Sequence, residues 1–124
     1  MIAYLSRTGN VKYIVDRLGL PAVKIEDGLR MQEPFFVFTY TDGLGQVPQA
    51  VRAFMAANFK LCRGVIASGN SNFGDGTGSN LFCKSADELS SVFRIPVIRK
   101  IDLRGYEEDY EHIRQKYKEL LKGE

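Results

Sequence analysis

The 124-residue chain is long enough for one domain that buries roughly two thirds of the surface of the unfolded chain without disulfides. Its formal net charge of +2 and its scattered Lys and Arg argue against a nucleic-acid or membrane partner. No apolar run reaches the length of a membrane span, the first predicted strand directly follows Met1, and Cys62 and Cys83 form no CxxC motif. We therefore expect a single cytoplasmic domain over residues 1–124, with reduced thiols and no metal site.

Short apolar runs alternate with amphipathic stretches, a pattern typical of a five-stranded doubly wound parallel α/β sheet with helices on both faces. The segment between the second and third strands, from Glu26 to Pro34, is too short for an ordinary crossover helix, so we expect that helix to be reduced or missing. In chain order, we predict strand Ile2 to Leu5, helix Asn10 to Leu18, strands Ala22 to Ile25 and Phe35 to Tyr40, helix Pro48 to Asn58, strand Gly64 to Ser68, helix Lys84 to Phe93, strand Val97 to Leu103 and helix Glu107 to Leu121.

The turn between the first predicted strand and the first helix is suited to an anion. Ser6 and Thr8 carry hydroxyls, Gly9 lets the backbone approach a ligand, and the amides around Asn10 are the unpaired donors of a helix start. We expect a phosphate there. The alternative is that Ser6, Thr8 and Asn10 only cap the helix. The Gly-Lys-Ser/Thr of a Walker loop is missing, which argues against nucleoside triphosphate hydrolysis.

Two glycine-rich loops follow the third and fourth predicted strands, from Thr41 to Pro48 and from Gly69 to Asn80. Ligands of open parallel sheets bind beyond the carboxyl ends of the strands, so we expect both loops to flank the phosphate turn. Leu44 and Phe73 offer apolar faces to a flat ring, and flavin mononucleotide (FMN) fits this pattern. The alternative is that the loops are flexible connections and that Phe73 packs into the core.

Five segments together carry a family resemblance. They are Ser6-Arg7-Thr8-Gly9-Asn10, Thr39 to Pro48, Gly64 to Gly74, Ser85-Ala86-Asp87 and Ile95-Pro96-Val97. These segments resemble the NrdI flavodoxins, and the resemblance covers nearly the whole chain. The segment Ala-Ser-Gly-Asn-x-Asn-Phe-Gly, together with the Gln-Val-Pro spacing, is specific to this group. The resemblance implies a flavodoxin-like sheet with strand order 2-1-3-4-5.

The resemblance also implies a function, that of a small FMN protein working beside class Ib ribonucleotide reductase. In this family the reduced flavin, fed by a flavin reductase or other donor that the sequence does not identify, passes electrons to dioxygen. It thereby delivers superoxide or a related oxidant to the dimanganese subunit, whose tyrosyl radical can then form. By matching position, the implied cofactor contacts are Ser6, Arg7, Thr8, Gly9, Asn10 and Val11 at the phosphate, and Tyr40, Thr41, Asp42, Gly43, Leu44, Gly45, Gly69, Asn70, Asn72, Phe73 and Gly74 around the ring.

Asp42 and Gly43 are the residues that we expect to control the flavin chemistry. Reduction places a proton on flavin N5, and a peptide carbonyl that rotates toward N5 accepts a hydrogen bond from it. Gly43 tolerates a positive φ, so the Asp42-Gly43 peptide is predicted to turn on reduction.

The sequence departs from the family at Val11, where many flavodoxins have a hydroxyl, and at residues 76–80, which form an insertion.

Two other functions share this fold. A general flavodoxin shuttle would exchange electrons only with proteins. A phospho-receiver module would need clustered carboxylates after the first strand, where this chain has Ser6 and Arg7. Cys83 lies near a predicted helix start, where the helix dipole lowers a thiol pKa, which would suit a redox partnership with the flavin. The alternative is that Cys83 is a buried, inert thiol.

Overall fold

Five parallel strands form the centre of the structure, a computed structural model that describes residues 1–41, 45–70 and 82–122. Their order in the sheet is β2-β1-β3-β4-β5, which confirms the predicted order. In chain order the strands are β1 (Ile2–Tyr4), β2 (Ala22–Lys24), β3 (Phe35–Tyr40), β4 (Cys62–Gly69) and β5 (Val97–Asp102).

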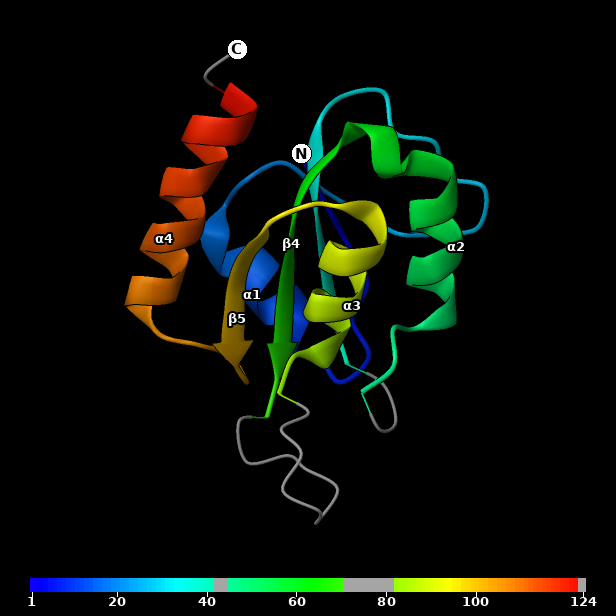
Figure 1. Cartoon of the computed structure of the whole chain (residues 1–124). Coiled ribbons are helices and arrows are strands. Elements are labelled where there is room, and N and C mark those ends of the chain that lie inside the picture. Colours follow the sequence, from blue (N-terminus) through cyan, green and yellow to red (C-terminus); the bar gives the residue numbers. More distant parts are fainter. Residues whose placement is uncertain (42–44, 71–81, 123–124) are drawn as a thin grey trace.

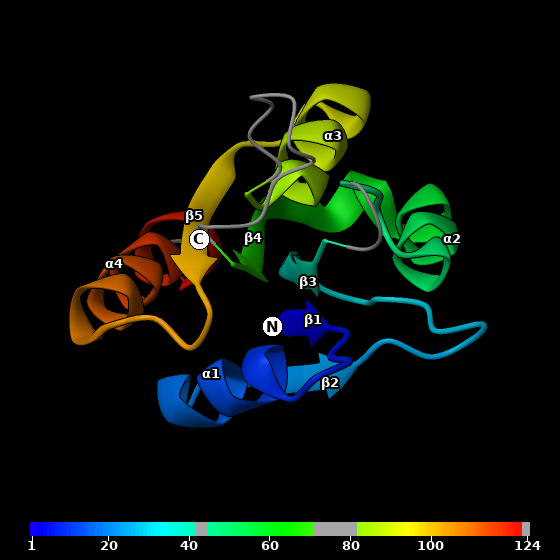
Figure 2. The same ribbon diagram turned by 90° about the horizontal axis from the view of Figure 1, so that it is seen from below.

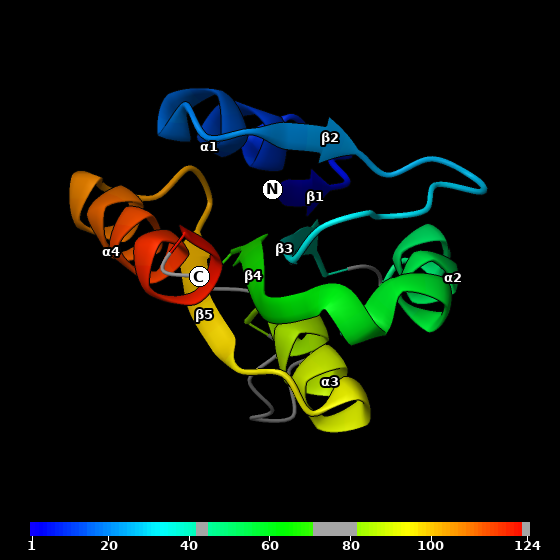
Figure 3. The ribbon, with the colours of Figure 1, turned by 90° about the horizontal axis from the view of Figure 1, so that it is seen from above.

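Helices cover both faces of this sheet. Seen along the strands, α1 and α4 lie on one face and α2 and α3 on the other (Figures 2 and 3). The connection from β2 to β3 is described throughout and contains no helix, as its length predicted. No described helix has the length and apolar character needed to cross a membrane. The helices are α1 (Asn10–Leu18), α2 (Gln49–Asn58), the 3-10 turn η1 (Phe59–Leu61), α3 (Lys84–Phe93), α4 (Glu107–Tyr117) and the π-helical turn η2 (Lys118–Lys122).

The central strand β3 joins two hydrophobic cores. Phe35 and Val37 belong to the core beneath α2 and α3, whereas Phe36 and Phe38 belong to the core beneath α1 and α4. All four side chains are fully buried, and each contributes roughly 1.5–3 kcal/mol through burial. The continuous apolar run thus has the two-sided burial that the sequence predicted.

The observed element bounds differ from the predicted ones by a few residues. β4 begins two residues early, at Cys62, because the pairing with β3 shifts register between Phe35 and Phe36. β5 ends before Leu103, because Leu103 adopts a left-handed φ of +56° that a strand cannot contain. α2 begins after Pro48, whose ψ of 138° is extended, and the last helix changes to a π-helical turn after Tyr117.

The topology collects several turns at one edge of the sheet. In Figure 1 the carboxyl ends of β4 and β5 point to the lower edge of the molecule. The chain leaves the neighbouring strands β1 and β3 toward opposite faces, which makes their junction a switch point in strand order. Several predicted residues at this edge lie outside the described residues, namely Asp42, Gly43, Leu44, Asn72, Phe73, Gly74 and the insertion 76–80.

Gly105, in the turn between β5 and α4, provides a test of the packing. Its φ is +74°, and a Cβ atom there would lie 2.6 Å from Cγ2 of Ile101 and 3.0 Å from Oδ2 of Asp109. That carboxylate oxygen accepts the amide of Tyr106 at 2.8 Å and caps α4. We expect Gly105→Ala to lower the free energy of unfolding by about 2–4 kcal/mol in urea denaturation, through strain and overpacking.

Gly19→Ala is the matched control, because Gly19 has a φ of +67° but no atom within 4 Å of the added Cβ. The Gly19→Ala variant has only the strain of a left-handed residue, so we expect its free energy of unfolding to fall by about 1 kcal/mol. Equal losses in the two variants would show that the contacts around Gly105 are not tight.

Candidate functional site

A cavity of about 530 Å³ opens where the carboxyl ends of β1, β3, β4 and β5 meet. This position is the switch point, where open parallel sheets bind ligands. Among the described lining residues the one charged side chain is that of Arg7, and its positive charge favours an anionic ligand. The described lining residues are Arg7, Thr8, Asn10, Val11, Tyr40, Thr41, Ser68, Gly69, Asn70 and Leu103.

The turn after β1 presents backbone donors at the start of α1. Gly9 is the N-cap residue, with a left-handed φ of 98° and no side chain to cap the helix. The Lys12 amide donates to Oγ of Ser6 at 3.2 Å, so Ser6 fulfils part of the capping alternative. The amides of Asn10 and Val11 have no acceptor within the described ranges. These two amides, near the positive end of the α1 dipole, can bind an anion.

Arg7 and Tyr40 lie against one another on the cavity lining. The guanidinium carbon of Arg7 lies 5.1 Å from the centroid of the Tyr40 ring, within range of a cation–π interaction. Both residues were predicted from the sequence, and both line the cavity. The pair therefore provides an aromatic surface and a positive charge on the same side of the site.

Leu103 forms a wall of the cavity that the sequence analysis did not include. Its amide donates to the carbonyl of Gly69 at 2.6 Å, and its carbonyl accepts the hydroxyl of Ser68, which also lines the cavity. These bonds to β4 hold a left-handed conformation that costs a non-glycine residue roughly 1–2 kcal/mol. The side chain is 47% exposed and gives the site an apolar border. The only local signal in the sequence is Gly105, which marks a turn.

Two hydroxyl groups connect the end of β3 to the start of α3. Oγ1 of Thr41 lies 2.9 Å from Oγ of Ser85, and the Ser85 amide donates to the same Thr41 oxygen at 3.3 Å. Ser85 is fully buried. This contact joins the residue after β3 to the second residue of α3.

The two cysteines are buried, free thiols. Burial raises the pKa of Cys83 to about 12 and that of Cys62 to about 11. Cys83 is the N-cap residue of α3, where the helix dipole would lower a thiol pKa, but the loss of solvation outweighs this effect. The structure supports the inert alternative for Cys83.

Across the described part of the chain, no cluster of three or more His, Cys, Asp or Glu residues could hold a metal ion.

The strand order and the cavity at the switch point define the class of flavodoxin-like proteins. A solved flavodoxin of Streptococcus pneumoniae TIGR4 has this fold, with a TM-score of 0.68, 26% sequence identity and coverage of 98% of this chain and 96% of that one.

Sequence comparisons identify the family within this class. The family model described as "NrdI Flavodoxin like" matches residues 2–115. Protein NrdI of Bacillus licheniformis is 35% identical over 121 residues, which cover 97% of this chain and 88% of that protein. Protein NrdI of Cronobacter sakazakii is 34% identical over 125 residues, covering 93% and 90%. The chain belongs to the NrdI flavodoxin-like family, as the sequence resemblance predicted.

NrdI and flavodoxin family members bind FMN, and membership implies an FMN flavoprotein associated with ribonucleotide reductase. The residues present fit this cofactor. Two backbone amides without an acceptor in the described part of the chain, and the hydroxyl of Thr8, suit a phosphate. Tyr40 and Leu103 offer apolar surface to a ring system.

Thr41→Val tests the contact between Thr41 and Ser85. The change preserves side-chain volume but leaves the buried Ser85 hydroxyl and amide without their partner, so we expect the free energy of unfolding to fall by about 1–3 kcal/mol. Thr41→Ser keeps the hydroxyl and is the control. In a double-mutant cycle with Ser85→Ala, additive losses would show that the two hydroxyls do not interact.

The raised thiol pKa values predict low reactivity. At pH 8 we expect both thiols of the native protein to react with DTNB at least about a hundredfold more slowly than in urea-unfolded protein. Both pKa values lie above the ordinary 9.0, so the unfolded state loses thiol protons first, and the free energy of unfolding falls between about pH 9 and 12. A rapidly reacting equivalent that disappears in Cys83→Ala would contradict the inert assignment.

Proposed function

We propose that this chain supplies the oxidant that assembles the dimanganese-tyrosyl radical cofactor of class Ib ribonucleotide reductase. Its proposed partners are the metal-binding subunit of that enzyme, a flavin reductase or other electron donor, and dioxygen. When bound, FMN supplies electron transfer to dioxygen, and one electron gives superoxide. The observation that carries the proposal is a cavity suited to an anion at the switch point of an NrdI family member.

The phosphate end of the site is proposed to lie at the start of α1. The amides of Asn10 and Val11 would hold the phosphate oxygens, and the hydroxyl of Thr8 lies on the same cavity wall. Gly9 permits the left-handed turn that aims these donors. Val11 needs no hydroxyl for this role, because its side chain is buried in the core and its backbone supplies the donor.

The ring end is proposed to lie between the loops after β3 and β4. Tyr40 and Thr41 mark the end of β3, and Gly69 and Asn70 mark the end of β4. Leu103 would shield this end from water. The roles of Leu44, Gly45, Asn72, Phe73 and Gly74, and the turning Asp42-Gly43 peptide, remain predictions from the sequence.

Electrostatics near the cavity favour the negative charge that reduction adds. Arg7 lies on the lining, where its positive charge attracts the charge that reduction adds. The formal net charge of the chain, +2, acts in the same direction. These residues thus lower the electrostatic cost of the reduced state.

The decisive experiment follows the reduced protein as it meets dioxygen. Protein loaded with one equivalent of FMN is reduced anaerobically and mixed with oxygenated buffer in a stopped-flow spectrometer. Superoxide is measured by cytochrome c reduction that superoxide dismutase abolishes. We expect reoxidation within seconds, and a tyrosyl radical in electron paramagnetic resonance when the manganese-loaded subunit is also present.

Free reduced FMN at the same concentration is the control for oxidant made in bulk solution, and it should give much less radical. Slow reoxidation with no radical, together with rapid electron exchange with other redox proteins, would support the general flavodoxin shuttle instead. The likeness to the flavodoxin of Streptococcus pneumoniae TIGR4 gives that alternative its basis.

A further inference from the structure

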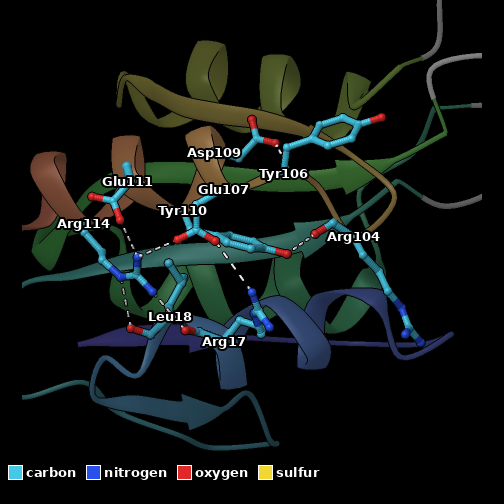
Figure 4. Close-up of polar contacts among 9 residues, drawn as sticks. All are labelled: Arg17, Leu18, Arg104, Tyr106, Glu107, Asp109, Tyr110, Glu111 and Arg114. Atoms are coloured by element: carbon cyan, nitrogen blue, oxygen red, sulfur yellow. Dashed lines mark hydrogen bonds and ion pairs between the residues drawn. The ribbon is translucent and has the colours of Figure 1, made fainter.

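Arg104 reaches from the turn between β5 and α4 to the start of α1, 94 residues earlier in the chain. Its Nε donates to Oδ1 of Asn10 at 3.2 Å, and its guanidinium carbon lies 4.4 Å from the centroid of the Tyr13 ring. Its carbonyl accepts the hydroxyl of Tyr110. In Figure 4 the Arg104 side chain extends from this turn toward α1. Both ends of the residue are therefore held in place.

The contact with Arg104 determines which way the Asn10 carboxamide faces. Arginine has only N–H donors, so the Asn10 atom beside it must be the oxygen. The amino group, with two donors, then lies on the other side of the carboxamide. Asn10 lines the cavity, and neither its amino group nor its backbone amide has an acceptor in the described ranges. Arg104 thus leaves Asn10 with only donors for the cavity.

We infer that Arg104 is a positioning residue for the phosphate of FMN, an inference that rests on the proposed function. It holds the Asn10 amino group toward the phosphate and brings a permanent positive charge to the start of α1. A phosphate monoester carries about −1.5 to −2 charges at pH 7. Hydrogen bonds to an ionised phosphate are stronger than those between neutral groups. Arg104 should therefore distinguish FMN from riboflavin, which has the same ring system and no phosphate.

A purely structural role for Arg104 makes a different prediction, because α1 and α4 have other contacts that hold them together. Arg114 donates to the carbonyl of Arg17 at 3.0 Å and to that of Leu18 at 3.5 Å, and Arg17 lies 3.6 Å from Glu107 (Figure 4). These contacts remain when the Arg104 side chain is removed, so the packing of the helices should survive.

The experiment compares FMN and riboflavin affinities of the apoprotein by flavin fluorescence quenching. We expect Arg104→Gln to weaken FMN binding about tenfold, since a lost charge-assisted contact of about 1.4 kcal/mol corresponds to that factor, and to change riboflavin binding less than about twofold. Arg104→Lys keeps the charge without the Nε contact and should lose about threefold. Arg63→Gln, at the opposite end of β4 from the cavity, makes the same charge change and should affect neither ligand.

Coupling to Asn10 completes the test. In an Asn10→Ala background, Arg104→Gln should weaken FMN binding by less than half the factor seen in the wild type, because the carboxamide that it positions is gone. Equal weakening of FMN and riboflavin by Arg104→Gln, or unchanged FMN affinity, would overturn the inference alone. Wild-type protein that binds no FMN would overturn the proposed function and the inference with it.

Discussion

Burial of β3 on both faces is the constraint on which the rest of the structure depends. A strand with Phe35 and Val37 in one core and Phe36 and Phe38 in the other needs a helical layer on each side. Parallel connections supply those layers, and they bring the carboxyl ends of four strands to one edge. The cavity lies at that edge, where the turns that follow β1, β3, β4 and β5 meet.

Electrostatics then determine what this cavity suits. Its donors are backbone amides and a hydroxyl, and its described lining contains positive but no negative side chains. The same principles raise the pKa of Cys83 to about 12 although it begins a helix, because complete burial costs a thiolate more than the helix dipole returns. Chemistry at this edge is therefore assigned to a bound cofactor and not to the nearby thiol.

Local sequence patterns predicted most of the architecture and the first half of the cavity. Among the described residues, apolar periodicity located the five strands and the four α-helices to within a few residues but not the 3-10 turn η1, and nine residues between two predicted strands indicated a reduced or missing crossover helix. The hydroxyl- and glycine-rich turn pointed to Thr8 and Asn10, and the family resemblance added Arg7 and Val11; all four line the cavity. Leu103 and Arg104 could not be found in this way. A left-handed leucine has no sequence signature, and a contact between Arg104 and Asn10 depends on tertiary packing across 94 residues.

The cavity has one wall from residues 7–11 and another from Leu103, so both terminal regions of the chain build it. It can form only after β5 has joined the sheet, late in synthesis of the polypeptide by the ribosome. A flavin bound in this cavity would stabilise the folded domain by mass action, because its lining exists only in the folded state. A higher free flavin concentration would therefore raise the free energy of unfolding and slow proteolysis of the unfolded chain.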